Sequence, residues 1–563
     1  MILQAILNLL GWTTTTHHSG IMGKVHAKPF STRYTNKRDS IDRQQVSPRT
    51  STVKKLEQLL EKERVVLVRG TPASGKTTLG QLLRRHYQHN KINGRLIPVV
   101  IFETWECDGK SYECKIREKG RQDYSEFEDS EFVRSGEYLL ILDEGQMSYP
   151  DRSLWYGIIK RQSWQFPGSG YGPRICILAL YGSPGAGPVY HPADASPVAS
   201  LTAAQRVSIT KSPLEGSPNI ALFYDRDELS DMISRFTDGG GMPKLRLSET
   251  ARTRICELTN GHPGAVFGIL YMLLEIYRNE LKYHSAELNE DHVQSALDDQ
   301  EAMQSVWLSP FRRSLPTELS EQVVFTLRKV LAEGWITRDL QDEGIKTCYE
   351  RGWLHSEPRD LECNDIVCVF PTRLHAMYVE RKFTKFIRPF PQKTYPTIED
   401  LAKDILGKFS PRNLSTRTLP TLGPGAVVRN PEAVYQDEFY RASAGVLGYA
   451  MDVKSEWSPR GSGRIDFCFG AMKWGIELLR EGDRLNEHCE RFMKEGIYSS
   501  WIQDKLLLDW IIIDCRTTEP RPYNGDDPSP KLWRAVFQNS FSSVKILDGK
   551  NKEIHQFVLT DDP

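Results

Sequence analysis

"GTPASGKTT", Gly70 to Thr78, is the stretch that decides the fold of the first half of this chain. An apolar, valine-rich run precedes it and a helix-like segment follows it. The stretch fits the pattern G-x-x-x-x-G-K-[ST], in which glycines let backbone N–H groups and the next helix face a phosphate. In this pattern Lys76 reaches the outer phosphates and is catalytic, and Thr77 ligates Mg²⁺. The residues expected to bind a nucleotide here are Gly70, Gly75, Lys76, Thr77 and Thr78.

A second acidic motif follows in "YLLILDE", residues 138–144, where an apolar strand ends in two carboxylates. Alone, such a pair usually faces solvent, but after a phosphate loop it fits the second motif of a P-loop NTPase. Asp143 is expected to hold the Mg²⁺ water shell, and Glu144 to orient or deprotonate the attacking water. The next apolar strand ends near Tyr181 and Ser183, which suit either a sensor position or an ordinary turn.

Composition limits the other possibilities. A chain of 563 residues is too long for one core, which predicts three or four domains. Its 73 basic and 73 acidic residues cancel, so binding to nucleic acid would need a local patch. No run approaches the ~20 apolar residues that span a bilayer, so no membrane role is expected. The ten cysteines show no zinc-finger spacing, which favours a reducing compartment.

The apolar pattern predicts an α/β multidomain chain. Continuous apolar runs separated by helix-length segments predict a parallel sheet, with "NIALFY", 219–224, as its last strand. Helical periodicity follows, and two short strand-like runs next to helices suit a winged helix. We expect a polar, basic and disordered arm over 1–54, a P-loop NTPase core over 55–225, a helical lid over 226–305, a winged-helix-like unit over 306–385, a linker over 386–396 and a second α/β domain over 397–561.

Two acids stand within apolar runs near the C-terminus, Asp466 in "RIDFCF" and Glu477 in "WGIELL". A carboxylate is costly to bury there without a partner. If a hairpin joins the two runs, both acids can hold one Mg²⁺, which would polarise a phosphodiester and activate water. The alternative is that they take no part in catalysis.

A metal site of this kind normally has a cation beside it. Lys473 precedes the second run and could reach inward, although a surface lysine is the alternative. Alternation along a strand argues against Arg480. Arg484, His488 and Arg491 form a polar stripe on the next helix, which fits a phosphate groove and a solvated face equally well.

"TNGHPG", Thr259 to Gly264, lies between two helical segments. From local chemistry alone, its glycine and proline favour a simple helix break.

Taken together, "GTPASGKTT", "ILDEGQMSYPDRSLWYGIIK", "LALYGSPG", "TNGHPG" and "RIDFCFGAMKWGIELLREGDRLNEHCERF" resemble the fungal-type Crinkler effector family over about residues 55–545. The resemblance implies a STAND-like P-loop NTPase followed by a restriction-endonuclease-like domain. It assigns phosphate binding to the loop residues and nucleotide contact from the lid to Gly261, His262 and Pro263. It also makes Asp466 and Glu477 the metal-binding acids of a nuclease core.

The chain departs from the family pattern in two places. Leu479 stands where the lysine of the E-x-K element is expected. The ubiquitin-like header of secreted members is not found in Met1 to Thr52, and the apolar run at 1–12 lacks a basic region before it. Localisation therefore stays open between the nucleus or a host nucleus, as the resemblance implies for a secreted effector, and the cytoplasm.

The leading hypothesis is a hydrolase of ATP or GTP that couples nucleotide state to a Mg²⁺-dependent, nuclease-like domain acting on DNA. One alternative is a nucleotide-dependent switch that binds DNA or protein through a degenerate nuclease domain. A STAND-type signalling ATPase that forms homo-oligomers is the other alternative.

Overall fold

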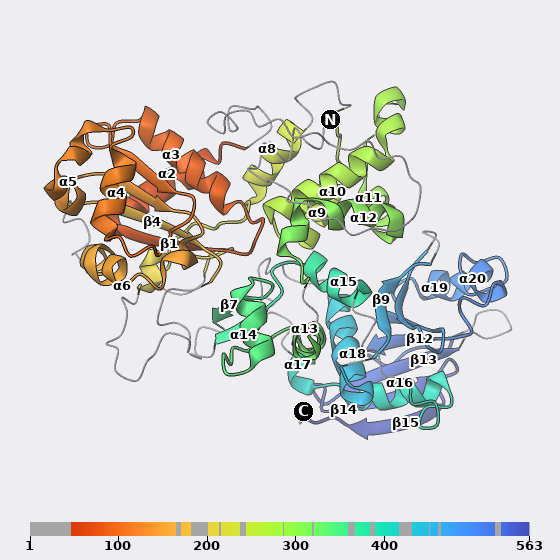
Figure 1. Ribbon diagram of the computed structural model, residues 1–563. Helices are drawn as coiled ribbons and strands as arrows, with labels where there is room; N and C mark the ends of the chain where they lie inside the picture. Colours follow the sequence, from red (N-terminus) through yellow and green to blue (C-terminus); the bar gives the residue numbers. More distant parts are fainter. Residues whose placement is uncertain are drawn as a thin grey trace, which may run out of the picture. The chain divides into compact units, whose positions relative to one another are not determined.

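The computed structural model (Figure 1) divides into two compact units, which are described separately. The first comprises residues 1–290, 305–314 and 350–352, and the second comprises the rest. The structure describes residues 47–164, 171–181, 201–212, 216–236, 244–284, 287–317, 320–358, 366–382, 389–415, 431–449, 451–459, 463–523 and 531–561.

The first unit is built on a five-stranded parallel sheet in the order β2-β3-β4-β1-β5. Its central strands are fully buried, and each face of the sheet has its own apolar core. The predicted parallel α/β sheet is therefore present. The strands are β1 (Val65–Arg69), β2 (Val99–Phe102), β3 (Leu139–Leu142), β4 (Arg174–Ala179) and β5 (Arg206–Val207).

Helices cover both faces of this sheet. α2 and α3 pack on one face, and α4, α5 and α6 pack on the other. The helices are α2 (Thr50–Glu63), α3 (Lys76–His89), α4 (Tyr112–Gly120), η2 (Ser125–Glu128), α5 (Ser130–Ser135), η3 (Gly145–Ser148), α6 (Arg152–Leu154), η4 (Trp155–Ile159), α7 (Lys160–Ser163) and η6 (Ala203–Gln205).

"NIALFY" is not a strand, which corrects the prediction for 219–224. Its apolar side chains, among them Leu222 and Phe223, are buried in the core beside α2 and α3. Its backbone makes separate hydrogen bonds, from Leu222 N to Ser208 O at 2.9 Å and from Phe223 N to Ile209 O at 3.0 Å. The run is apolar because its side chains pack in the core, and not because its backbone forms a β-ladder.

The predicted boundary of the N-terminal arm also falls too late in the chain. Arg49 is buried, and its guanidinium lies 2.9 Å from the Glu228 carboxylate and donates to Leu222 O at 2.8 Å. Thr52 donates to the same carboxylate at 2.6 Å. The folded part therefore includes Ser47 to Thr52, and residues 1–46 lie outside the described residues.

A helical subdomain completes the first unit, as the predicted lid requires. It consists of α8 (Arg226–Phe236), α9 (Glu249–Thr259), α10 (Pro263–Ile276), η7 (Glu280–His284) and the short η8 (Pro310–Ser314). α10 is apolar nearly all round and is buried, and η8 packs against it. The predicted end of the lid at 305 is not the boundary, because residues 291–304 cluster with the second unit and 305–314 with the first.

The second unit begins with helices and a small antiparallel sheet in the order β6-β8-β7, which fits the winged-helix prediction. The elements of this region are α11 (Glu290–Asp298), α12 (Gln300–Leu308), α13 (Glu321–Glu333), β6 (Ile336–Thr337), α14 (Glu343–Glu350), β7 (His355–Pro358), β8 (Ile366–Val369) and α15 (Arg373–Lys382), and the last residues of α12, 305–308, cluster with the first unit. Tyr395, within the predicted linker, is buried in the core of the domain that follows.

That last domain is a seven-stranded mixed sheet in the order β15-β14-β13-β12-β11-β10-β9. β11, β12 and β13 run parallel, and the outer strands are antiparallel. The strands are β9 (Val453–Trp457), β10 (Ile465–Phe469), β11 (Trp474–Arg480), β12 (Asp509–Arg516), β13 (Leu532–Gln538), β14 (Ser543–Asp548) and β15 (Glu553–Val558).

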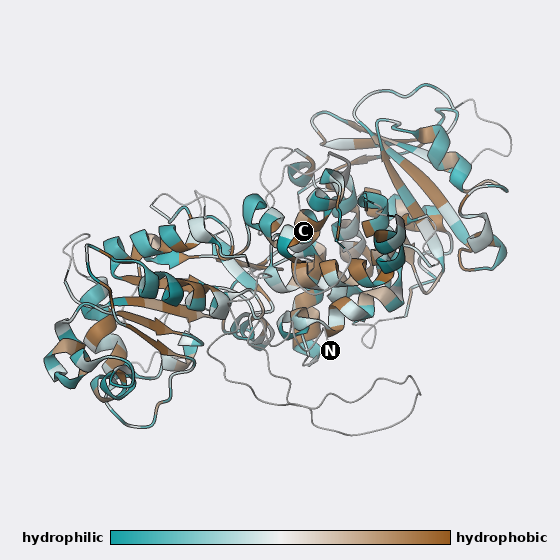
Figure 2. Ribbon diagram, turned by 90° about the horizontal axis from the view of Figure 1, so that it is seen from above, coloured by the Kyte–Doolittle hydropathy of each residue, from teal (hydrophilic) through white to brown (hydrophobic). Residues whose placement is uncertain are grey.

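Helices again cover both faces, so the middle strands are apolar on each side. α16 (Ile398–Leu406), α17 (Pro411–Ser415) and α18 (Pro431–Leu447) lie on one face. α19 (Leu485–Arg491) and α20 (Ser499–Gln503) lie on the other. Hydropathy colouring shows brown strands between mostly teal helix surfaces (Figure 2).

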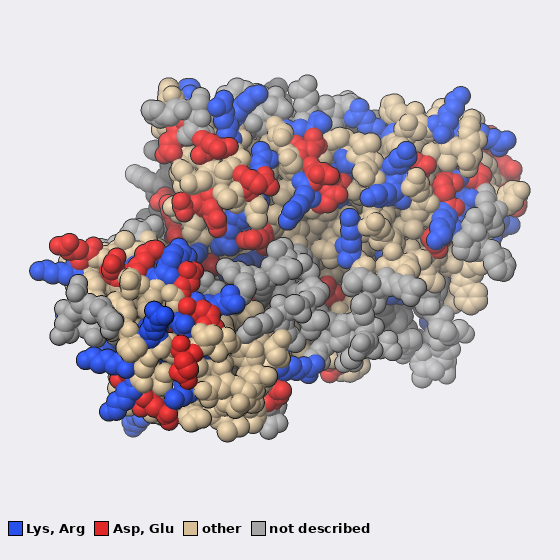
Figure 3. Space-filling view, turned by 180° about the vertical axis from the view of Figure 1, so that it is seen from behind, with Lys and Arg blue, Asp and Glu red and all other residues tan. Residues whose placement is uncertain are grey.

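The surface agrees with the balanced charge of the sequence. On the face seen in Figure 3, Lys and Arg side chains are interspersed with Asp and Glu side chains. In the part of the chain that the structure describes, no helix has the length and hydrophobicity needed to cross a bilayer.

Replacing Arg49 with alanine tests the corrected N-terminal boundary. Arg49→Ala leaves the buried Glu228 carboxylate without its cation, which should lower the free energy of unfolding of the first unit by about 3 kcal/mol. Urea denaturation measures this change. Arg134→Ala breaks an exposed pair with Glu113 and should cost at most about 1 kcal/mol. Equal, small effects of the two variants would place Arg49 in a loose arm after all.

Candidate functional site

The phosphate loop connects β1 to α3 at the carboxyl edge of the parallel sheet. Gly70 N donates to Ala179 O of β4 at 3.0 Å, which fixes the start of the loop. A Cβ at Gly70 would lie 2.2 Å from a Leu222 methyl, so this position has no room for a side chain. Gly75 has φ of 85° and directly precedes α3, a conformation that favours glycine. The loop therefore points the first turn of α3 toward the space above it.

Lys76 is the first residue of α3 and is buried. Its ammonium donates to Gly70 O and Thr71 O, both at 2.8 Å. Burial lowers the pKa of Lys76 to about 8, the charges of Glu144 and Asp143 oppose that shift, and the charge of Arg313 adds to it. The lysine is thus held at the loop by two hydrogen bonds and has a lowered pKa. Both features are expected of a buried lysine that binds an anion.

Thr77 and Asp143 bring two hard oxygens together beside Lys76. The Asp143 carboxylate accepts a hydrogen bond from the Thr77 hydroxyl, and its Oδ1 also accepts from Glu144 N at 3.1 Å. Burial raises the pKa of Asp143, while the bond from Thr77 lowers it. Hydroxyl and carboxylate oxygens are the ligands that Mg²⁺ prefers, so these two residues fit the predicted metal. Thr78 follows, half-buried in the same turn.

Glu144 stands at the end of β3 with φ of 47°, in the left-handed region that a non-glycine residue rarely adopts. Its Oε2 accepts from Gln146 Nε2 at 2.6 Å, and Gln146 Oε1 accepts from Leu180 N at 3.1 Å. Gln146 therefore connects the acid to the end of β4. The sequence did not single out Gln146, and its only signal was a polar side chain two residues after the acid.

The predicted sensor position is half-buried Tyr181, whose carbonyl accepts from the Tyr149 hydroxyl at 2.7 Å. Ser183, its predicted neighbour, lies outside the described residues.

The turn at Gly261, His262 and Pro263 packs directly against the phosphate loop. His262 is fully buried, and its Nδ1 accepts from Ala265 N at 3.1 Å, which caps α10. Its Nε2 therefore carries the ring proton and faces Pro72 O at 3.3 Å. Burial lowers the pKa of His262 to about 3, so the ring is neutral. The turn therefore does more than end a helix, because its histidine also contacts the phosphate loop.

Two further contacts join the same turn to the loop. Gly264 N donates to Ala73 O at 3.1 Å. A Cβ at Gly75 would lie 3.2 Å from the Pro263 ring. Contact of His262 and Pro263 with a nucleotide stays a prediction, because the contacts present are with the loop.

In the C-terminal domain, Asp466 and Glu477 lie on adjacent strands. The antiparallel register pairs Phe467 with Ile476, which places the two acids side by side on β10 and β11. Burial first, and then the charges of both acids among other groups, raise the pKa of buried Tyr498. The hairpin that the metal-site prediction needs is therefore present.

The two carboxylates nevertheless have different hydrogen-bond partners. Asp466 accepts from Gln436 of α18 at 2.9 Å and from Leu478 N at 2.6 Å. Glu477 is buried and its Oε1 lies 2.8 Å from both His488 Nδ1 and Arg491 of α19. Two members of the predicted polar stripe thus contact Glu477, and Arg491 compensates its charge.

The structure does not bring Lys473 to these acids. Lys473 lies in the turn before β11, about 13 Å of strand from Glu477, and its ammonium donates to Lys505 O at 2.9 Å. Leu479 pairs with Asp514, and Asp514 pairs with Arg534 on β13. Buried Arg534 forms an ion pair with Asp514. The arginine at this register position is therefore already paired and does not replace the missing lysine.

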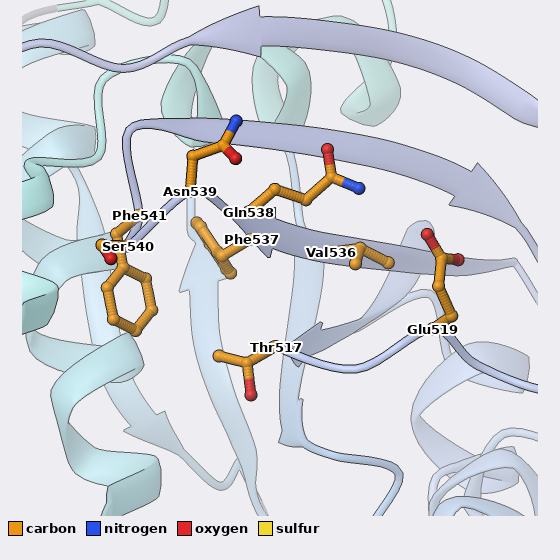
Figure 4. Close-up of a pocket in the computed structure, with 8 residues that line it drawn as sticks. All are labelled: Thr517, Glu519, Val536, Phe537, Gln538, Asn539, Ser540 and Phe541. Carbon is orange, nitrogen blue, oxygen red and sulfur yellow. The ribbon is translucent and has the colours of Figure 1, made fainter.

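Among the described residues, no group of three or more His, Cys, Asp and Glu side chains could hold a metal ion. Mg²⁺ binding by Asp466 and Glu477 remains a prediction. A shallow cavity of about 280 Å³ opens at the ends of β12 and β13 (Figure 4). It contains none of the residues predicted from the sequence, and is lined by Thr517, Glu519, Val536, Phe537, Gln538, Asn539, Ser540 and Phe541.

Comparison with known proteins gives only distant likenesses. The chain matches no family model and no curated protein. A structure of Drosophila ORC bound to DNA has a TM-score of 0.27 and 11% identity, over 64% of this chain and 96% of the other. A Walker-type ATPase of Pyrococcus abyssi has a TM-score of 0.30 and 14% identity, over 59% and 96%. The Thermotoga maritima RuvB Holliday junction branch migration motor has a TM-score of 0.25 and 16% identity, over 57% of this chain and 91% of the other. TM-scores this low support no assignment of the site, which therefore rests on its local geometry.

The lowered pKa of Lys76 predicts proton uptake when Mg-ATP or Mg-GTP binds. At pH 8.5 the free protein holds Lys76 mostly neutral, and an anion restores the ammonium, so roughly half a proton or more should be taken up per nucleotide. At pH 7 the lysine is charged in both states and uptake should vanish. Calorimetry in two buffers of different ionisation enthalpy measures the proton count. Lys62→Ala, at an exposed position, is the control, and binding at pH 8.5 without uptake would contradict the role of Lys76.

Proposed function

We propose that this chain is a Mg²⁺-dependent P-loop NTPase that hydrolyses ATP or GTP. One observation carries the proposal: Lys76, the Thr77–Asp143 pair and Glu144 meet at the loop between β1 and α3. Any one of these features has a structural explanation. Their combination at the carboxyl edge of a parallel sheet is what phosphoryl transfer requires, because that reaction depends on positioning and on compensation of phosphate charge.

Each residue then has a separate task. Loop N–H groups and the Lys76 ammonium bind the outer phosphates, and Lys76 exchanges its two carbonyl partners for phosphate oxygens. Thr77 and Asp143 would hold Mg²⁺, which neutralises part of the triphosphate charge when bound. Glu144, fixed by Gln146, is placed to orient a water or to take its proton.

We further propose, from the resemblance to Crinkler effectors, that nucleotide state controls the C-terminal domain and that this domain acts on DNA. The turn formed by Gly261, His262 and Pro263 supports this proposal, because it could transmit a change in the phosphate loop to the helical subdomain. His262 joins the loop to α10 by two hydrogen bonds, so a change in loop conformation has to move the helix or break a buried bond.

For the C-terminal domain two functions remain in competition. Adjacent placement of Asp466 and Glu477 favours a Mg²⁺-dependent nuclease, as the resemblance implies. The second candidate is a degenerate domain that binds DNA or protein without cutting. The ion pair of Glu477 with Arg491 favours it, because a carboxylate paired with a cation already has its charge compensated.

Two substitutions separate nucleotide binding from turnover. Glu144→Gln removes the acid that orients water, so kcat should fall about 100-fold or more with affinity nearly unchanged. Lys76→Ala should weaken binding itself. Phosphate release and nucleotide titration measure the two quantities, with Glu118→Gln on the exposed surface of α4 as a control. Full turnover in Glu144→Gln would show that another group serves this step.

Plasmid cleavage in Mg²⁺ decides between the two functions of the C-terminal domain. If it is a nuclease, Asp466→Asn combined with Glu477→Gln should reduce cleavage by about 100-fold or more, since the substitutions keep size and remove both charges. Salt-sensitive DNA binding by the wild type without any cleavage would instead establish the binding function. Equal cleavage by wild type and double variant would mean that these acids are not catalytic.

A further inference from the structure

The carbonyl oxygens at the start of the phosphate loop all accept hydrogen bonds from the protein itself. The acceptors and their donors are Gly70 O and Thr71 O with Lys76 Nζ at 2.8 Å each, Pro72 O with His262 Nε2 at 3.3 Å, and Ala73 O with Gly264 N at 3.1 Å. The Ser74 hydroxyl is also used, because it donates to Thr71 O at 2.6 Å. These groups are therefore satisfied inside the loop.

The hydroxyl of Thr71 is the exception. Thr71 is 1% exposed, and among the residues that the structure describes its Oγ1 has no hydrogen-bond partner. A buried hydroxyl without a partner costs free energy, because it has given up its hydrogen bonds to water. Valine has nearly the same shape and would fill the position without this cost. The loop therefore has a polar atom where packing alone favours an apolar side chain.

Covalent geometry places this hydroxyl near the Lys76 ammonium. Oγ1 is separated by four covalent bonds from Thr71 O, which lies 2.8 Å from Lys76 Nζ. Four bonds span at most about 5 Å, so the hydroxyl and the ammonium are at most about 8 Å apart. One phosphoryl group with a hydrogen bond on either side can bridge such a distance.

The carbonyl of Thr71 is not the group that is left for a ligand. It already accepts from both Lys76 and Ser74, and a carbonyl oxygen has two lone pairs. The hydroxyl is a donor, as the oxygens of a phosphate require.

We propose that the Thr71 hydroxyl donates a hydrogen bond to an outer phosphate of the nucleotide, the phosphate that Lys76 binds. This role rests on the proposed NTPase function and adds a residue at a position that the phosphate-loop pattern leaves free. When phosphate oxygens replace Gly70 O and Thr71 O as partners of Lys76, they enter the space beside Thr71. The hydroxyl then gains a charged acceptor, and hydrogen bonds to charged groups are stronger than those between neutral groups.

A hydroxyl that is bonded only in the complex links stability to binding with opposite signs. It lowers the stability of the nucleotide-free protein and raises the affinity for nucleotide. Removing a hydroxyl that holds the fold would instead lower stability, and removing one without any role would leave affinity unchanged. The two readouts together therefore separate a ligand contact from a structural role.

The test measures stability and affinity in Thr71→Val, Thr71→Ser and Thr52→Val. Urea denaturation of the nucleotide-free protein gives the first quantity, and titration with fluorescent mant-ATP and mant-GTP in Mg²⁺ gives the second. Thr71→Val should lower the equilibrium constant of unfolding and raise the Kd of both triphosphates, each about tenfold. Thr71→Ser retains the hydroxyl and should keep most of the affinity.

Thr52→Val is the matched control. Thr52 is also buried, but its hydroxyl donates to Glu228 at 2.6 Å, so the same substitution should reduce stability and leave the affinity for nucleotide unchanged.

Each other outcome contradicts a stated part of the argument. Unchanged affinity in Thr71→Val would overturn the role of Thr71, while the NTPase proposal stands if Lys76→Ala still weakens binding. Loss of both stability and affinity in Thr71→Val would overturn it too, because the hydroxyl would then belong to the fold. Equal loss of affinity in Thr71→Ser and Thr71→Val would show that the hydroxyl is not what binds. If folded wild type binds neither triphosphate, the NTPase proposal fails and the role of Thr71 fails with it.

Discussion

The neutral imidazole of His262 is the constraint on which the first unit depends. Its ring has one acceptor and one donor, and both are used, the first by Ala265 N of α10 and the second by Pro72 O of the loop. Burial keeps the pKa of His262 near 3, so the ring does not gain a second proton at ordinary pH. A charged ring would lose the cap on α10, and an apolar residue would lose both bonds. The helical subdomain and the phosphate loop therefore move together or break buried hydrogen bonds, and η8 follows through Phe311.

Much of this site could be predicted from the sequence because its chemistry is local. The spacing of Gly70, Gly75 and Lys76 carries its own backbone geometry, and an apolar strand that ends in Asp143 becomes informative because it follows that loop. The rest depends on tertiary contacts. Arg49 looks like one basic residue of a polar arm until Glu228, far along the chain, is seen beside it. "NIALFY" has the composition of a strand, but burial of Leu222 and Phe223 explains that composition without a ladder.

The C-terminal domain shows the same division. Alternation along β10 and β11 places Asp466 and Glu477 on neighbouring strands, and the register bears this out. Lys473 is near Glu477 in sequence, yet it lies in a turn with φ of 55° just before β11. Arg491 and His488 belong to a helix after the strand, and only the crossover from β11 to β12 brings them over Glu477. Sequence periodicity predicts which face a residue occupies, but it does not predict which helix covers that face.

Charge balance distinguishes the two carboxylate sites in this chain. At the phosphate loop, the Lys76 ammonium donates to two backbone carbonyl oxygens, which the oxygens of an entering polyanion can replace. At β11, Glu477 already has Arg491 and His488 within 2.8 Å, and removing Arg491 would leave the buried carboxylate without that cation. A metal at Glu477 would have to displace or repel Arg491, whereas Mg²⁺ at Asp143 would replace the hydrogen bond from the neutral Thr77 hydroxyl. A buried carboxylate is thus bonded to neutral groups in one domain and paired with an arginine in the other.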